Sequence, residues 1–124
     1  MEETKRQKQV GRLVQVELSD IFQREGVAAA GGGLISVSEV KMTPDLLEAK
    51  VMLSFFQVSD VKAMLESIRE RSAEWRNLLG RRTRNQLRRI PELQYFADES
   101  LERAFKMETL FDEIRKERES RSSD

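Results

Sequence analysis

The feature that most constrains the fold is a pair of segments in which apolar and polar residues alternate, at 34–42 and at 49–56. Between them, residues 43–45 have turn chemistry, because a proline cannot donate to a strand ladder and an aspartate favours turns. The pattern therefore predicts an antiparallel hairpin with one apolar face. The alternation changes phase in the middle of the first segment, which predicts a β-bulge near Ser38-Glu39.

A first amphipathic helix is predicted before the hairpin. Thr4 and Gln7 have the spacing of a capping box, apolar residues recur at helical spacing over 10–22, and Gly26 can end the helix. Basic residues crowd the first half of this helix and acidic residues the second half, an order that opposes the helix dipole and has no stabilising rationale in the sequence. The glycines at 31–33 lead into a strand and not into a Lys-Ser/Thr pair and a helix, so they do not form a phosphate-binding loop.

Two further helices are predicted after the hairpin. Ser59 can cap the first and Ser72 the second, and because no strong breaker separates them, a kinked pair and one bent helix both remain open. Apolar residues at helical spacing continue to Ile90, where Pro91 stops the helix. Trp75 shares a face with apolar residues of the second helix, which favours core packing over a base-stacking role.

A short third strand at 92–96 and a last helix that begins near Asp98 complete the predicted order αββααβα. The remaining residues, 115–124, are predicted to be a charged, disordered tail. With 124 residues, the chain has the length of one domain. We therefore expect a single two-layer α+β domain over residues 4–114.

The composition argues against several kinds of active site. The sequence contains no cysteine and no histidine, which removes disulfides, thiolate and imidazole metal ligands, cysteine nucleophiles and the usual general base. The carboxylate pairs Asp98-Glu99 and Asp112-Glu113 occupy adjacent positions of predicted helix, where side chains diverge. We therefore expect no enzyme activity, no metal or other cofactor and no small-molecule substrate. No apolar leader and no run long enough to cross a bilayer are present, so we expect a cytoplasmic protein with no membrane partner.

Charge is the main functional signal. The net charge is +0, yet residues 69–90 hold eight arginines against two glutamates, and residues 91–124 hold six basic against ten acidic residues. Arginine binds phosphate bidentately and stacks on bases, so the cluster predicts an anionic polymer as ligand. An alternative is that the acidic C-terminal segment pairs with these arginines within the fold. The predicted RNA-binding residues are Arg76, Arg81, Arg82, Arg84, Arg88 and Arg89, joined by Lys5, Arg6, Lys8 and Arg12 if the first helix packs with its basic end nearby.

The predicted order, with an arginine-rich helix after a helix-to-helix junction, resembles a type II KH domain, although the junction has no GxxG. Several short blocks of the sequence carry a second resemblance: Lys5-Arg6-Gln7-Lys8-Gln9-Val10, Ile35-Ser36-Val37 with Val40, Thr43-Pro44-Asp45-Leu46, Ala49-Lys50-Val51, Arg76 with Leu79-Gly80, Leu87-Arg88, Pro91-Glu92-Leu93, Phe96 and Asp98-Glu99-Ser100. With these blocks, the sequence from about residue 4 to residue 114 resembles the ribosome-binding factor A family. The Ala-x-Gly that the family has at the helix-to-helix junction has no clear counterpart at 71–73.

The resemblance implies a KH-like domain in which a three-stranded sheet packs on helices. It implies binding, as a monomer, to the free or immature 30S subunit with contacts to 16S rRNA. The family's role, which is not catalytic, is to assist late maturation by promoting processing or folding of that rRNA, particularly in the cold. The alternative is a general KH-like RNA-binding module, or a protein-interaction module, that is not specific to the ribosome.

Overall fold

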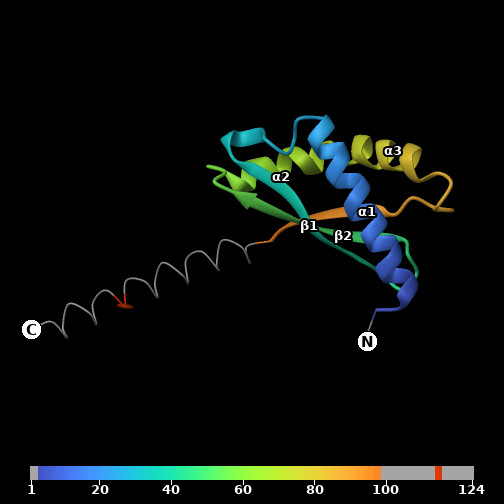
Figure 1. Cartoon of the computed structure of the whole chain (residues 1–124). Coiled ribbons are helices and arrows are strands. Elements are labelled where there is room, and N and C mark those ends of the chain that lie inside the picture. The colour runs from blue at the N-terminus through green and yellow to red at the C-terminus, as the bar shows by residue number, and fades with distance from the viewer. Residues whose placement is uncertain (1–2, 99–113, 116–124) are drawn as a thin grey trace, which may run out of the picture.

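The computed structural model describes residues 3–98 and 114–115 of the chain (Figure 1). Within this part the order of helices and strands is the predicted αββααβ, with one additional 3-10 turn. The predicted last helix and the predicted tail lie outside the described residues, apart from 114–115. The elements are α1 (Lys5–Arg24), the 3-10 turn η1 (Ala30–Gly32), β1 (Leu34–Met42), β2 (Glu48–Phe56), α2 (Val61–Glu70), α3 (Ser72–Thr83) and β3 (Glu92–Ala97).

The three strands form one sheet in the order β1-β2-β3. β1 and β2 pair antiparallel, which confirms the predicted hairpin, and the register shifts between Val37 and Glu39, which confirms the predicted bulge at Ser38. β3 pairs parallel to β2. A parallel pair needs a crossover connection, and here α2 and α3 supply it.

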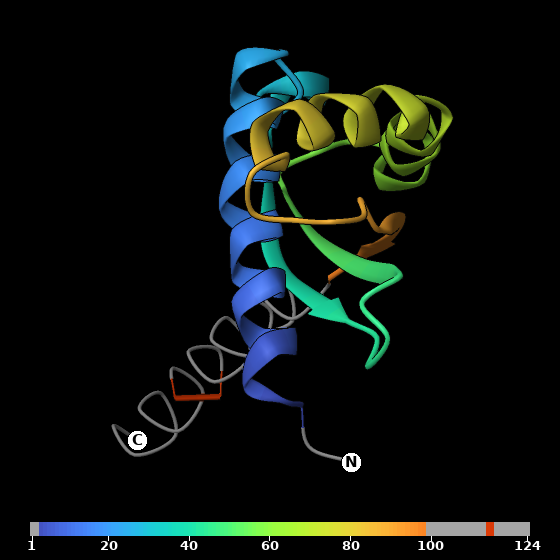
Figure 2. The ribbon, with the colours of Figure 1, turned by 90° about the vertical axis from the view of Figure 1, so that its right-hand side faces the viewer.

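The helices lie on one side of the sheet, as Figures 1 and 2 show. α1 packs on β1 and α3, and α2 packs on β3. The predicted capping box is present, with Gln7 N–H donating to Thr4 Oγ1 at 3.1 Å and Thr4 N–H donating to Gln7 Oε1 at 2.8 Å. Gln7 Nε2 also donates to the carbonyl oxygen of Met42 at 3.0 Å. The close approach of α1 to β1 depends on Gly11, because a Cβ atom at this position would lie 2.7 Å from the carbonyl oxygen of Val40.

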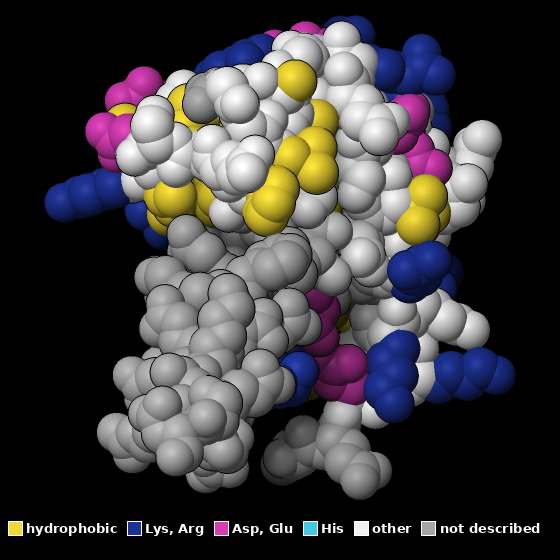
Figure 3. All heavy atoms as spheres, turned by 60° about the vertical axis from the view of Figure 1, so that its left-hand side comes forward, with side chains coloured by type: hydrophobic (Ala, Val, Ile, Leu, Met, Phe, Trp, Pro, Cys, Tyr) yellow, Lys and Arg dark blue, Asp and Glu magenta, His cyan; other side chains and the backbone are white. Residues whose placement is uncertain are grey.

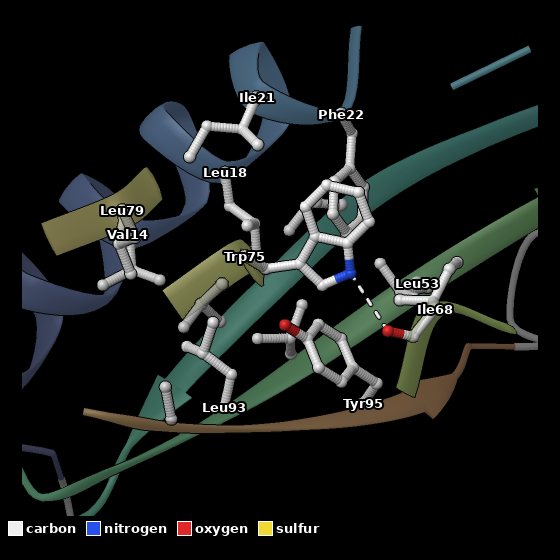
Figure 4. Close-up of a cluster of buried hydrophobic side chains, with 14 of the residues drawn as sticks. Val14, Leu18, Ile21, Phe22, Leu53, Ile68, Trp75, Leu79, Leu93 and Tyr95 are labelled. Atoms are coloured by element: carbon white, nitrogen blue, oxygen red, sulfur yellow. Dashed lines mark hydrogen bonds between the residues drawn. The ribbon is translucent and has the colours of Figure 1, made fainter. Parts of the chain in front are cut away.

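Trp75 of α3 lies in the centre of the core (Figure 4). The side chain is fully buried, and its ring packs edge to face on Phe22 with the centroids 5.1 Å apart. The indole N–H donates to the carbonyl oxygen of Ile68 at 3.0 Å. On the outer side, the guanidinium carbon of Arg71 lies 4.2 Å from the centroid of the ring. Trp75 is therefore a core residue, as its spacing in the sequence favours.

α2 and α3 are two separate helices, which resolves the alternative that the sequence leaves open. Arg71, with φ −97° and ψ 17°, ends α2 and precedes α3. Asp60, and not the predicted Ser59, caps α2, because its carboxylate accepts from the N–H of Ala63 at 3.0 Å. Ser72 is the first helical residue of α3, so the prediction that it caps this helix is wrong.

α3 ends at Thr83, so the prediction that this helix continues to Ile90 is wrong. The Thr83 hydroxyl donates to the carbonyl oxygen of Leu79 at 2.8 Å, and the N–H groups of Gln86 and Leu87 both donate to the Thr83 carbonyl oxygen at 2.9 Å. These bonds close a turn that places Leu87 in the core. The burial expected from the helical spacing of Leu87 is thus achieved by a turn.

Candidate nucleic-acid interface

The predicted cluster divides between α3 and the loop that follows it, residues 84–91, which we call the arginine loop. Arg84, Arg88 and Arg89 lie on this loop and not on a helix, and all three side chains are exposed. Leu87 and Pro91 of the same loop are buried. The loop is therefore held to the core by its apolar residues while its arginines face solvent.

Arg76 of α3 fixes the end of the arginine loop. Its Nε donates to the carbonyl oxygen of Pro91 at 3.2 Å, and its Nη2 donates to the carbonyl oxygen of Ile90 at 2.9 Å. The N–H of Glu92 donates in turn to the carbonyl oxygen of Leu47 in the turn between β1 and β2, at 2.8 Å. The charged guanidinium of Arg76 thus donates to two backbone carbonyls, which gives this residue a structural role although it is exposed.

Arg82, although predicted as an RNA-binding residue, points to α1. Its Nη1 lies 3.2 Å from a carboxylate oxygen of Glu17 and 2.6 Å from one of Asp20. The hydrogen bond from Arg82, together with one from Arg24, holds the pKa of Asp20 below its usual range. This contact explains why α1 carries acidic residues in its second half, which the sequence alone leaves without a stabilising reason. Among the described residues, the acidic partners of Arg82 are Glu17 and Asp20 of α1.

Four of the predicted arginines make no hydrogen bond or ion pair with the part of the chain that the structure describes. They are Arg81, Arg84, Arg88 and Arg89, and all four are exposed. Arg6 of α1 is exposed and unpaired in the same sense. Within the part of the chain that the structure describes, these guanidinium groups therefore have donors left over for a ligand.

The arginines that have no partner among the described residues line two adjoining grooves. The α3 groove, of ≈ 860 Å³, lies between α3, the arginine loop and Leu47. The α1 groove, of ≈ 720 Å³, lies between the start of α1, the turn between β1 and β2, and the arginine loop. Arg84, Arg89 and Leu47 line both grooves, so the two form one surface. The arginines that line the α3 groove are Arg76, Arg81, Arg84 and Arg89, and those that line the α1 groove are Arg6, Arg84, Arg88 and Arg89.

The basic start of α1 lies beside the arginine loop, as the prediction for that helix required, because Arg6 lines the α1 groove. Lys5 and Lys8 are exposed on α1 but line neither groove. Arg12 is exposed and donates to Gln15 Oε1 at 3.5 Å. Of the four α1 residues that were predicted to bind RNA, Arg6 is thus the one that the fold places beside the arginine loop.

Two residues of the surface are not among the predicted ones. Asn77 lines the α3 groove one helical turn before Arg81, a spacing that the sequence could have revealed. Leu47 lines both grooves and is 42% exposed. An apolar residue in a turn does not by itself indicate a binding surface, so the sequence could not predict this position. Each groove also contains one carboxylate, Glu92 in the α3 groove and Asp45 in the α1 groove.

The side of the molecule shown in Figure 3 differs from this surface. Hydrophobic side chains gather in its upper half, and basic side chains are spread around its margin with acidic ones between them. Leu34, Phe56 and Phe96 are among the exposed apolar residues of the sheet. This face therefore combines exposed apolar side chains with charges of both signs.

The fold and the site together define a class of protein. A helix before an antiparallel hairpin, a helix pair as crossover and a parallel third strand are the arrangement of a type II KH-like α+β domain. This domain carries an arginine-lined surface at one end. Within the described residues, no group of acidic side chains is arranged to hold a metal ion, and no helix is long and apolar enough to cross a membrane.

Comparison with known proteins identifies the family. The model of the family described as ribosome-binding factor A matches residues 6–111. A relative from Cytophaga hutchinsonii with the same description is 38% identical over 112 residues, which are 90% of this chain and 84% of the relative. The chain therefore belongs to the ribosome-binding factor A family, and the resemblance noted in the sequence is confirmed.

Solved structures of the family share the fold. The crystal structure of ribosome-binding factor A from Thermus thermophilus superposes with a TM-score of 0.62 at 18% identity, over 73% of this chain and 94% of that chain. A homology model of the Thermus thermophilus factor, fitted into a cryo-EM map of a complex of the factor with 30S, gives a TM-score of 0.58 at 18% identity, over 79% of this chain and 97% of that chain. At this identity the likeness confirms the KH-like fold.

Proposed function

We propose that the protein binds the free or immature 30S subunit as a monomer, contacts 16S rRNA through the surface formed by the α3 and α1 grooves, and assists late maturation of the subunit by binding alone. Membership of the ribosome-binding factor A family supports this proposal. The Thermus thermophilus factor, which was fitted into a map of a 30S complex, supports the choice of partner.

The observation that carries the proposal is a set of arginines, without partners among the described residues, around two adjoining grooves in a protein of net charge +0. Arginine forks match phosphate oxygens geometrically, and each phosphate that is neutralised releases condensed counterions. Arg82 is left out of the proposed surface because its charge is used on α1, and Arg76 contributes mainly by holding the arginine loop. The residues that we place in contact with RNA are Arg6, Arg81, Arg84, Arg88 and Arg89.

The test is co-sedimentation with isolated 30S subunits, compared with complete ribosomes, at graded salt. We expect a preference for isolated 30S subunits and affinity that falls steeply with salt. The double variant R81E/R84E should bind weakly and lower the slope of log K against log salt by about 1.5, since each phosphate contact contributes roughly 0.7 to 0.9.

The matched control is K41E/K50E, which makes the same change in net charge on a different surface. Lys41 and Lys50 are exposed and pair across β1 and β2. This control should keep the affinity and the slope. If a folded R81E/R84E variant binds as well as its parent, the surface is wrongly assigned. If the parent binds isolated subunits, complete ribosomes and unrelated RNA equally, the protein is a general RNA-binding module.

A further inference from the structure

The first half of the arginine loop is fixed by its own backbone and by an apolar side chain. The N–H groups of Gln86 and Leu87 both donate to the carbonyl oxygen of Thr83, each at 2.9 Å. The side chain of Leu87 is buried in the core. These contacts hold the start of the loop without the help of a charged side chain.

The end of the loop is held differently, by the side chain of Arg76. Among the described residues, the guanidinium of Arg76 is the hydrogen-bond donor to the carbonyl oxygens of Ile90 and Pro91, through Nη2 at 2.9 Å and Nε at 3.2 Å. We call these two bonds the Arg76 clamp. Two successive carbonyls require two donors from one side, and the planar guanidinium fork supplies them. The ammonium group of a lysine has no such fork.

The Arg76 clamp also determines how the loop lies relative to the turn between β1 and β2. Directly after the clamp, the N–H of Glu92 donates to the carbonyl oxygen of Leu47 at 2.8 Å. The N–H of Leu47 donates in turn to Oδ1 of Asp45 at 3.1 Å. Arg84, Arg89 and Leu47 line both grooves. The clamp therefore fixes the loop where it meets the turn, and with it the placement of arginines on the shared surface.

Like charges around the α3 groove make such a clamp necessary. Arg76, Arg81, Arg84 and Arg89 all line this groove, and their mutual repulsion favours a loop that moves away from α3. The bonds of the Arg76 clamp oppose this movement. Charges held at a fixed spacing cost little ordering entropy when a ligand binds, and they fit one arrangement of phosphates better than others.

We propose that Arg76 is a positioning residue that determines the selectivity of RNA binding. It acts through the arginine loop, so that Arg84, Arg88 and Arg89 present a single arrangement of charge. With the clamp the loop fits the phosphates of the 30S subunit, and without it the loop keeps its charge but binds RNA with little distinction. This inference rests on the proposed function and adds to it the residue from which selectivity arises.

The experiment compares two variants of the full chain that keep the positive charge, R76K and R81K. The ligands are isolated 30S subunits and a short RNA duplex of unrelated sequence. R76K should bind 30S subunits roughly 3- to 10-fold more weakly, the size expected for the net loss of one hydrogen bond. Its affinity for the duplex and its salt slope should equal those of the parent, because no charge is lost. R81K, which keeps the clamp, should weaken both affinities by the same factor.

Hydrogen exchange of the protein alone reports on the two ends of the loop separately. The amide of Glu92 is bonded at the clamped end, and the amide of Leu87 is bonded at the other end. R76K should increase the exchange rate of the Glu92 amide and leave that of the Leu87 amide unchanged, because local opening affects only the bonds that it breaks. R81K should leave both exchange rates as in the parent.

Several results would overturn the inference. Unchanged selectivity in R76K would show that the clamp does not determine it, and an equal loss of selectivity in R81K would assign it to guanidinium groups in general. Loss of selectivity in R76K without faster exchange at Glu92 would mean that Arg76 contacts the RNA itself. Faster exchange at Leu87 as well, with both affinities reduced equally, would indicate a general loss of stability. Equal binding of 30S subunits and the duplex by the parent would instead remove the proposed function itself.

Discussion

Nη1 of Arg82 on α3 lies 2.6 Å from Oδ2 of Asp20 on α1, so Arg82 differs from the arginines that have no partner among the described residues. We predict that R82Q lowers the melting temperature by roughly 2–6 °C, the modest effect of a half-exposed ion pair in a small domain. The variant should keep the salt slope of RNA binding, because Arg82 is outside the proposed surface. Differential scanning fluorimetry and salt-dependent titration give the two readouts. A lower slope at unchanged melting temperature would place Arg82 on the RNA.

The ion pair between Arg82 and Asp20 predicts that the stability of the protein depends on pH in the acidic range. The pKa of Asp20 is lowered in the folded state by Arg82 first and Arg24 second, from an ordinary value of 3.8. A lowered folded-state pKa means that the stabilisation is fully present above the unfolded-state pKa and is lost as the pH falls through the folded-state pKa. The difference in melting temperature between the parent and D20N should therefore be constant near neutrality and shrink below about pH 4. A difference that does not change between pH 6 and pH 3 would contradict this account.

The fold was largely predictable because local chemistry specifies it. Alternation and turn residues define the hairpin, the phase change defines the bulge at Ser38, and Thr4 with Gln7 defines the start of α1. The end of α3 was not predictable, since the helical spacing of Leu87 fits both a helix that continues to Ile90 and a helix that ends at Thr83. Tertiary packing favours the earlier end, because the turn after Thr83 buries Leu87 and lets the backbone reach β3.

The candidate site was predictable in kind but not in its individual roles. The density of arginine marks the segment, yet Arg81 and Arg82 are neighbours with opposite surroundings, one in the α3 groove and the other on α1. Adjacent helical positions diverge, so which one faces solvent depends on how α3 is rotated against α1. The sequence likewise could not show that Leu47, remote from the cluster along the chain, would complete both grooves.

The burial of Trp75 predicts that it matters for stability and not for RNA contact. W75A should lower the free energy of unfolding by about 3–5 kcal/mol, because a fully buried aromatic leaves a large cavity. W75F should cost less, about 1–3 kcal/mol, since the ring is retained but the carbonyl of Ile68 loses its donor. Urea denaturation measures both changes. Binding of folded W75F to RNA should match the parent, and weakened binding with unchanged stability would mean that Trp75 acts at the interface.

The contact at Gly11 predicts that a substitution which favours helices will nevertheless destabilise the protein. Alanine gains up to about 1 kcal/mol of helix propensity over glycine. At Gly11, however, the added Cβ would lie 2.7 Å from the Val40 carbonyl oxygen, so α1 must move away from β1. We expect G11A to be less stable by about 1–3 kcal/mol in urea denaturation, as for other overpacked sites. G80A is the matched control, with the same gain in propensity but a contact at 3.2 Å to a side-chain atom of Ile90, which can shift. If G11A proves as stable as G80A, the distance between α1 and β1 is not limited by this glycine.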